Sequence, residues 1–310
     1  MLNFIRRFKL TYMIYNLFQR GKLKHNERLY KLLGLRKWYF SPVSSADFAK
    51  CDPSKISKII HTQQAESTAL YNELDAESQE NIRNFDRDGY VILKKYLDKS
   101  TVTSVNAEIA ELLKIGKVKF RYKNKIMFAI HQSELLLQIG EDEKLLELLN
   151  SLVGEEMKLF SSINFILGSE QKTHSDSIHM TTYPLGGLLG VWIALDDIDD
   201  ENGPLHYYPG SHKLPYYLNA DYDNAGNAVM IGSKDYSAYE AMIAQKLEDQ
   251  KGNKKVFHAK KGDLLIWHAN LFHGGEPHIN KSKTRRSMVF HYYAENRVCY
   301  HEISQRPALI

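Results

Sequence analysis

The chain has few cysteines, few tryptophans and no long apolar run. Its 310 residues include only two cysteines, Cys51 and Cys299, which form no disulfide framework and favour a reducing cytoplasm. No stretch approaches the roughly 18 consecutive apolar residues that a membrane span requires. A hydrophobic content of 43% with 25% charged residues is typical of a globular protein. We therefore expect a soluble, cytoplasmic, enzyme-sized chain.

Positive charge is concentrated at the N-terminus. Residues 1–40 contain ten lysines and arginines and one acid, Glu27, whereas residues 41–310 contain 31 basic and 36 acidic residues. The basic excess is confined to one end and no recognition motif accompanies it. We therefore expect no nucleic-acid partner.

The N-terminal segment itself predicts a helix. Over residues 2–18, apolar residues recur at three- and four-residue spacing among Arg6, Arg7 and Lys9, which indicates an amphipathic helix. Two interpretations are open: the helix packs on the body with its basic face in solvent, or it rests on an anionic membrane surface or a partner. With a proline- and serine-containing linker at 41–62, residues 1–60 are expected to form a basic helical extension of a main domain at 61–310.

Beyond residue 60 the pattern changes to short strands. Helices are expected at 63–85 and 98–114, on either side of a β-rich segment at 89–93. Strand candidates follow at 118–122, 125–130, 157–166, 179–183, 188–195, 204–208, 256–257, 264–267 and 287–293. Glycine- and proline-containing turns separate most of them, which favours a mostly β chain with flanking helices (α+β), as a sandwich or jelly roll. About forty residues at 214–255, with a helical patch near 238–247, interrupt the series and are interpreted as a lid-like insertion.

Two motifs that lie far apart offer the ligands of a metal site. His174 and Asp176 are two residues apart, so on an extended strand both side chains would lie on one face. A third ligand must come from a distant strand, and His273, followed by two glycines that permit close approach, is the best candidate. Two imidazoles and one carboxylate are the set that holds Fe(II) on one face and leaves the opposite face open.

A basic residue follows the second motif. Arg285 is expected to open the last strand, where its planar guanidinium can grip a carboxylate through two hydrogen bonds; Arg286 is the alternative. His-x-Asp alone is a weak signal. The order of His-x-Asp, a strand-rich interval, His-Gly and then an arginine in the next strand is a stronger one.

On these motifs, residues 160–295 resemble the phytanoyl-CoA dioxygenase family of Fe(II)/2-oxoglutarate-dependent oxygenases. The matching segments are 173–179, 190–198, 202–205, 208–213, 262–263, 273–274 and 285–287. The stretch 86–97 resembles the family's opening segment, so the resemblance covers about 80–295. Residues 1–60 and the insertion at 214–255 fall outside it.

The resemblance implies a double-stranded β-helix (a cupin-like jelly roll) with iron held by His174, Asp176 and His273 and 2-oxoglutarate anchored by Arg285. The implied reaction is hydroxylation of an aliphatic carbon in a small-molecule, lipid-linked or sugar-linked substrate, with O2 consumed and succinate and CO2 released. Asp176 favours hydroxylation, because halogenating members of the family carry a small residue there. Trp192 is expected to form a pocket wall beside the co-substrate, with a plain core position as the alternative.

Two positions depart from the family pattern. Arg285 follows His273 by twelve residues rather than eleven, and Gly275 stands where related enzymes often carry a hydroxyl. The rival hypotheses are a non-catalytic binding module and an isomerase or hydrolase that uses another divalent metal. The presence of His174, Asp176, His273 and Arg285 together argues against the first. Arg285 discriminates the second, because without a dicarboxylate co-substrate it has no partner and Arg285→Ala would be silent. The expected partner is a small molecule, with peripheral membrane contact through the basic N-terminus as a further hypothesis.

Overall fold

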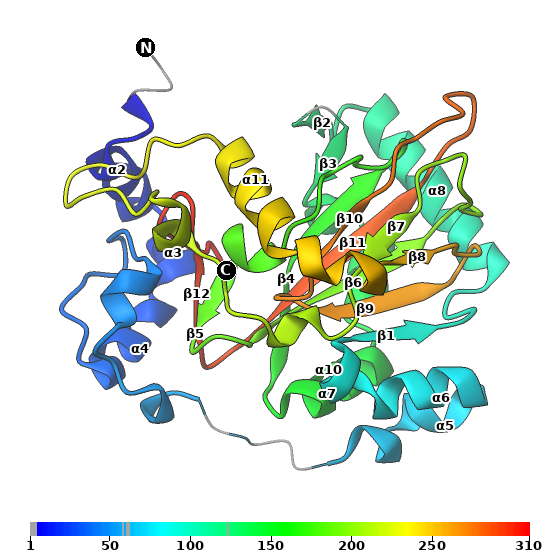
Figure 1. Ribbon diagram of the computed structural model, residues 1–310, viewed down its shortest axis with the longest axis horizontal. Coiled ribbons are helices and arrows are strands. Elements are labelled where there is room, and N and C mark those ends of the chain that lie inside the picture. Colours follow the sequence, from blue (N-terminus) through cyan, green and yellow to red (C-terminus); the bar gives the residue numbers. More distant parts are fainter. Residues whose placement is uncertain (1–4, 58, 60–62, 123) are drawn as a thin grey trace.

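The computed structural model describes residues 5–310 except 58, 60–62 and 123. Its centre is a seven-stranded antiparallel sheet in the order β1-β9-β6-β11-β4-β3-β2 (Figure 1). The bounds of these strands, in that order, are Tyr90–Leu93, Leu264–His268, Leu188–Ala194, Ser287–Ala294, Met157–Phe165, Lys125–Met127 and Phe120–Arg121. Two three-stranded sheets complete the β structure, β10-β7-β8 (His273–Gly275, Leu205–Tyr207, Lys255–Phe257) and β13-β12-β5 (Arg306–Pro307, Val298–His301, Thr181–Tyr183).

The large sheet is buried on both faces. Along β6 every residue is buried, and the strand register aligns Trp192 with Leu265 of β9 and Val289 of β11 on one face. These residues belong to an inner core that also includes Tyr207 and Phe257, from the β10-β7-β8 sheet. Because side chains alternate along a strand, the residues between them point to the opposite face. The two sheets thus enclose an apolar interior, as in a jelly roll.

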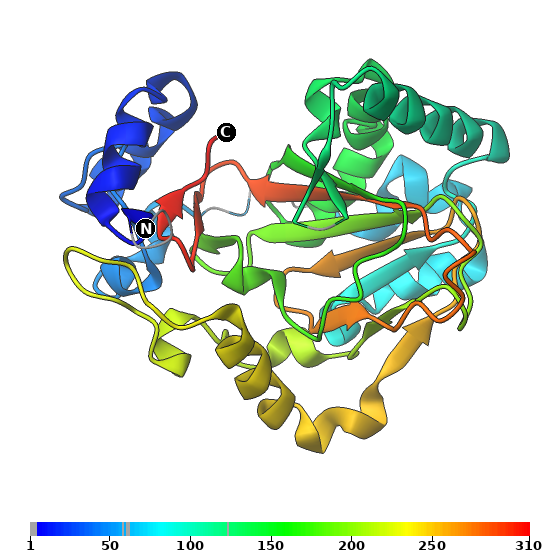
Figure 2. The same ribbon diagram turned by 90° about the horizontal axis from the view of Figure 1, so that it is seen from above.

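Helices cover the outer face of the large sheet. They are α5 (Ala69–Glu73), α6 (Ala76–Arg83), α7 (Phe85–Asp88), α8 (Lys99–Lys114), α9 (Glu134–Gly140) and α10 (Glu143–Val153), with short 3-10 turns at Ala65–Ser67 and Ala129–His131. The helices of residues 99–153 lie along one side of the sheet (Figure 2). Local sequence sets where they begin: the carboxylates of Asp75, Asp98 and Asp142 accept hydrogen bonds from the first-turn amides of α6, α8 and α10.

The N-terminal helices gather at one end of the molecule, away from the large sheet (Figures 1 and 2). They are α2 (Lys9–Leu17), α3 (Arg20–Leu23) and α4 (His25–Leu33), followed by 3-10 turns at Ser45–Phe48 and Pro53–Lys55. The buried side chains of α4 pack with Val298 and Tyr300 of β12. The extension is therefore attached to the C-terminal strands rather than to the large sheet.

The insertion at 214–255 forms 3-10 turns at Asn219–Tyr222 and Glu248–Asn253 on either side of α11 (Tyr236–Lys246). Tyr239 and Ile243 of α11 are fully buried against a cluster that includes Ile178 and Phe272. Phe272 directly precedes His273, so the insertion packs over both ligand motifs. Its role as a lid stays a prediction.

The mostly β architecture with flanking helices is confirmed, and most strand predictions coincide with observed strands. Three differences separate the structure from the expectation. The helix expected at 63–85 is broken into short pieces, because Asp75 caps a new helix after Leu74 adopts an extended backbone. The helices α9 and α10 and the strands β10, β12 and β13 were not predicted. Asp176 does not lie on an extended strand but begins a 3-10 turn, Asp176–Ile178.

Candidate metal centre

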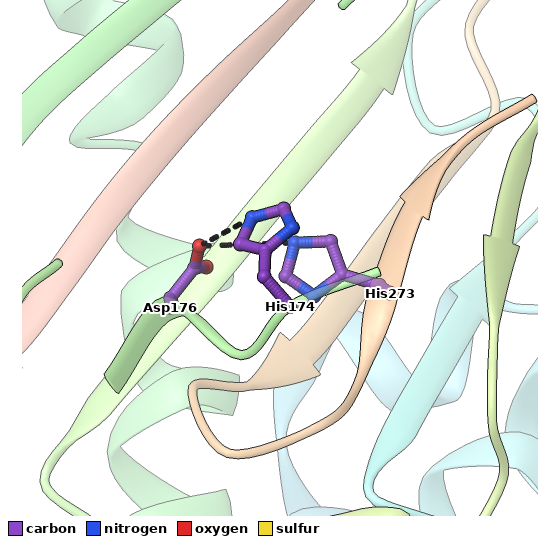
Figure 3. A group of neighbouring side chains, drawn as sticks. All are labelled: His174, Asp176 and His273. Atoms are coloured by element: carbon purple, nitrogen blue, oxygen red, sulfur yellow. Dashed lines mark ion pairs between the residues drawn. The ribbon is translucent and has the colours of Figure 1, made fainter. Parts of the chain in front are cut away.

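The two distant motifs meet through their backbones. His174 and His273 form an isolated antiparallel bridge, in which each backbone N–H donates to the carbonyl of the other at 2.9 Å. Asp176 follows at the first position of its 3-10 turn. One ligand atom from each of the three buried side chains lies within 4.8 Å of the others. In Figure 3 the carboxylate of Asp176 faces both imidazole rings.

Hydrogen bonds orient both imidazoles for coordination. His174 Nδ1 lies 2.8 Å from the carbonyl of Lys172, and His273 Nδ1 lies 2.9 Å from the carbonyl of Leu271. Since a carbonyl only accepts, each Nδ1 carries the proton and each Nε2 presents its lone pair. Both Nε2 atoms lie 3.7 Å from Asp176 Oδ1. The lone pairs and the carboxylate therefore converge, which is the arrangement that a divalent metal requires.

The charge of the cluster suits a cation. Burial lowers the pKa of His273 to about 4, so this imidazole is neutral at physiological pH. Burial alone would raise the pKa of Asp176, but its contacts with His273 and His174 hold that pKa well below the usual range. The ionised Asp176 carboxylate beside the neutral His273 imidazole therefore offers a cation an anionic ligand and a neutral one.

Arg285 is a buried cation next to the inner core. Its side chain is 3% exposed, and burial lowers its pKa to about 10. It donates from Nε to the carbonyl of Gly203 at 3.1 Å and from Nη1 to Ser287 Oγ at 2.8 Å, and it lies 5.1 Å from the ring centre of Trp192. Within the described part of the chain, no carboxylate forms an ion pair with it. A buried guanidinium without a counter-charge is costly unless a ligand supplies one.

The structure separates the two arginine candidates. Arg286 is partly exposed and pairs with Asp196, with Nε 3.1 Å from Oδ2. Its backbone N–H donates to the same oxygen at 2.8 Å. Arg285 and Arg286 directly precede β11, and of the two only Arg285 is buried toward the interior, whereas Arg286 remains partly exposed.

Trp192 lies in the inner core beside Arg285. The side chain is 2% exposed, and its ring packs edge-on against Phe257 at 5.9 Å. Its indole Nε1 is buried without a hydrogen-bond partner among the described residues. The structure thus brings Trp192 next to the arginine but not into the group of three ligands.

Comparison of the sequence with models of known protein families shows which family this chain belongs to. The family model for phytanoyl-CoA dioxygenase (PhyH) matches residues 85–287, which is more than half of the chain. The chain belongs to the phytanoyl-CoA dioxygenase family. The C-terminal part of the matched range contains all three clustered side chains and Arg285, so the family match and the geometry concern the same region.

Individual relatives in the family are more distant. The chain is 30% identical over 124 residues to the phytanoyl-CoA dioxygenase domain-containing protein 1 homolog of Caenorhabditis elegans, a match that spans 38% of either chain. It is 23% identical over 236 residues to ectoine dioxygenase of Bordetella bronchiseptica, covering 71% of this chain and 76% of that one. Thus the chain spans under two fifths of the length of the first of these relatives.

Two solved structures share the fold. The α-ketoglutarate-dependent carbocyclase SnoK from nogalamycin biosynthesis superposes with a TM-score of 0.58 at 18% identity, covering 77% of this chain and 89% of SnoK. EctD from S. alaskensis with bound Fe gives 0.56 at 18% identity, covering 77% and 82%. At this identity the likeness concerns the fold alone, and it confirms the double-stranded β-helix.

Around the His174–Asp176–His273 cluster lie side chains that sequence reasoning missed. Trp267 donates from Nε1 to Asp176 Oδ2 at 2.7 Å. Gly190 makes room for this indole, because a Cβ there would lie 2.4 Å from the ring. His291 Nε2 lies 3.8 Å from the same carboxylate oxygen. The alternation of β9 and β11 places both side chains in the interior, but spacing alone does not reveal their contact with Asp176.

Gln171 and Lys125 form a polar arm beside the cluster. Gln171 Nε2 donates to His174 Nε2 at 3.1 Å, and its Oε1 accepts from Lys125 Nζ at 3.0 Å. Burial lowers the pKa of Lys125, and the ionised Asp176 opposes that shift. Lys125 thus adds a partly buried amine to this side of the molecule.

A second polar group clamps the ligand motifs from outside. His206 Nε2 lies 2.8 Å from Thr173 Oγ1, next to His174, and His206 Nδ1 lies 2.7 Å from Glu276 Oε1, three residues after His273. A Cβ at Gly274 would lie 2.7 Å from the His206 ring, so glycine is required for this contact. The network joins the two motifs without touching the converging lone pairs.

Proposed function

We propose that the chain is an Fe(II)/2-oxoglutarate-dependent dioxygenase that hydroxylates an aliphatic carbon of a small-molecule substrate. One observation carries this proposal: the structure contains both a buried His-Asp-His group and a buried guanidinium, that of Arg285, which forms no ion pair among the described residues. A structural zinc site would account for the first feature but not for the second. Membership of the phytanoyl-CoA dioxygenase family supports the assignment.

The residues present fit the metal. In the proposal His174, Asp176 and His273 are its ligands, and their open side faces the interior. Trp267 and the carbonyls of Lys172 and Leu271 hold the ligands in position. Bound Fe(II), with 2-oxoglutarate and O2, supplies the oxidising power for C–H hydroxylation, while 2-oxoglutarate is converted to succinate and CO2.

The residues also fit a dicarboxylate. Arg285 presents its guanidinium beside Ser287 Oγ, which offers a hydroxyl to the same carboxylate. Without a ligand, the negative charge of Asp176 faces the positive charges of Arg285 and Lys125. A divalent metal adds two further positive charges. A dianion balances most of this excess. Arg285 is therefore the proposed anchor of 2-oxoglutarate, with Trp192 as the wall behind it.

The apolar interior protects this chemistry from water. The inner core lines one side of the site, and α11 covers the other, with Tyr239 OH accepting from the backbone N–H of Ser175 at 3.3 Å. Exclusion of water strengthens each charged contact within the site. The substrate is proposed only as a small molecule, with lipid- and sugar-linked forms included.

We also propose a cytoplasmic location, on the basis of cysteine chemistry. Cys51 and Cys299 are both free thiols in the structure. Burial raises the pKa of both thiols, most strongly that of the fully buried Cys299, which keeps it protonated and unreactive. Among the described residues, no helix is long and apolar enough to cross a membrane.

The test is anaerobic addition of Fe(II) and 2-oxoglutarate to the purified protein. Bidentate keto-acid coordination at such an iron gives a weak visible charge-transfer band, which we expect in the wild type and not in His174→Ala. His258→Ala is the matched control, because His258 is half-exposed and pairs with Asp200 on the surface; its band should persist. A metal-loaded wild type without the band would refute the proposal and favour another metal or a non-catalytic module.

A further inference from the structure

The helix α2 exposes its apolar side. Leu10, Ile14, Leu17 and Phe18 are 62%, 54%, 47% and 79% exposed, and their spacing places them on one side of the helix. The opposite side holds Asn16, which is 1% exposed and donates to the carbonyl of Phe40 at 3.3 Å. The helix packs on the body through the side that holds Tyr12, Met13 and Asn16, but the face that it leaves in solvent is apolar rather than basic.

Further apolar side chains flank both ends of this helix. The backbone N–H of Lys9 donates to the carbonyl of Val229, which is 60% exposed, so the insertion borders the start of α2. At the other end Tyr39 OH donates to the carbonyl of Leu17, and the adjacent Trp38 is 67% exposed. We define the α2 face as the exposed Leu10, Ile14, Leu17 and Phe18 of the helix end to end, with the exposed Ile5, Trp38 and Val229 on the segments that border its two ends. Soluble monomers rarely leave so many large apolar side chains together in water without a partner.

The segments next to α2 in the chain are rich in exposed cations. Exposed lysines and arginines lie before and after the helix in the chain, at Arg6, Arg20, Lys22, Lys24, Arg28, Lys31 and Arg36. The only acid among residues 1–40 is Glu27, which lies 3.8 Å from Arg20. An apolar strip with cations on the adjoining segments is complementary to an anionic lipid surface, where acyl chains receive the strip and phosphates meet the cations. A second copy of this end would instead bring like charges together.

The inner side of α2 leads toward the metal centre. Tyr12 lies under the guanidinium of Arg306, 5.1 Å from its central carbon. Arg306 is the cross-strand partner of His301, whose ring is 6.3 Å from that of His179. The ring of His179 in turn is 5.7 Å from that of His174. A lipid surface on α2 would therefore lie at the same end of the molecule as this row of side chains.

We propose that the α2 face docks this protein on anionic membranes. In the docked state α2 lies parallel to the bilayer, with Leu10, Ile14 and Phe18 among the acyl chains and Arg20 at the phosphates. The inference does not depend on the proposed chemistry, because it concerns a surface outside the three ligands. It can therefore fail or succeed independently of the dioxygenase assignment.

The experiment is co-sedimentation of the full chain with phosphatidylcholine vesicles, with and without phosphatidylglycerol. The wild type should bind the anionic vesicles and leave the neutral ones, and added salt should weaken binding. Phe18→Asp and Ile14→Asp should each lower the partition coefficient at least about tenfold, because each places a charge where an apolar side chain would be buried in the bilayer. Ile279→Asp is the matched control: Ile279 is 71% exposed in the loop between β10 and β11, and its substitution should leave binding unchanged.

Three results would overturn the proposal. Equal binding to neutral and anionic vesicles would remove the role of charge. Equal losses in Phe18→Asp and Ile279→Asp would show that the α2 face is not the binding surface. A wild-type dimer in light scattering that becomes a monomer in Phe18→Asp would assign the face to a second copy of the chain. Circular dichroism of each variant establishes that α2 substitutions leave the fold intact.

Discussion

Replacement of Arg285 by methionine should stabilise the metal-free protein and abolish its response to 2-oxoglutarate. The pKa of Arg285 falls to about 10 through burial, which corresponds to roughly 3 kcal/mol of desolvation cost. Methionine removes this cost but also two hydrogen bonds, to Gly203 and Ser287, worth about 1 kcal/mol each. The net gain is about 1 kcal/mol, or an increase in Tm of about 2 °C.

The effect on the co-substrate is opposite in sign. Loss of a desolvated guanidinium–carboxylate contact costs about 2–5 kcal/mol of binding free energy, so the Kd of 2-oxoglutarate should rise by roughly 30-fold or more. The assay is thermal unfolding of the Mn(II)-loaded protein at increasing 2-oxoglutarate concentrations. Ligand binding raises the Tm of the wild type by mass action, and Arg285→Met should show no such rise at 2-oxoglutarate concentrations up to a few times the wild-type Kd.

The matched variant is Arg286→Met. Its guanidinium pairs with Asp196 and remains partly exposed, so the thermal response to 2-oxoglutarate should persist. The reasoning is refuted if the two variants respond alike. A lower Tm for metal-free Arg285→Met than for wild type would separately contradict the view that this cation lacks a counter-charge.

Two further outcomes follow from groups near the cluster. Trp267→Phe removes the 2.7 Å hydrogen bond to Asp176, so Mn(II) affinity measured by calorimetry should fall about ten- to a hundredfold; unchanged affinity would mean that the carboxylate is positioned without the indole. Burial lowers the pKa of His268 to about 3 in the folded protein, whereas its pKa in the unfolded chain is about 6.5. At pH values below about 6.5 the unfolded chain therefore binds more protons than the folded protein, and the free energy of unfolding falls as pH decreases. His268→Gln should reduce this slope by up to about 1.4 kcal/mol per pH unit between pH 6 and 4 in urea unfolding, and an unaltered slope would contradict the assignment.

Sequence patterns predict those features of this protein that depend on local order. The alternation of apolar residues located most strands. The order of the two motifs predicts which side chains meet, although their roles as iron ligands and co-substrate anchor stay proposals. The expectation that Asp176 lies on an extended strand was wrong. Asp176 begins a 3-10 turn, and this turn, rather than the alternation of side chains along a strand, brings its carboxylate toward His174.

Features that depend on non-local packing were out of reach. The indole of Trp267 reaches Asp176 across 91 residues, and His206 bridges Thr173 and Glu276 from a third segment. Nothing in their spacing distinguishes them from ordinary core residues. For α2, periodicity shows that the helix is two-sided but not which side faces water, because only the body of the protein decides that.

The contact between α4 and β12 has a consequence for biosynthesis. Leu29 and Tyr30 belong to a core cluster with Val298 and Tyr300. The ribosome synthesises these partners much later: the nearby hydrogen bond between Arg28 and Asn296 spans 268 residues of sequence. At roughly 5–20 residues per second, the first helices wait for roughly 15 to 50 s before their partner strand is synthesised. During that interval a basic, amphipathic nascent segment has no folded surface to join. The last dozen residues therefore determine when the first forty can adopt their final structure.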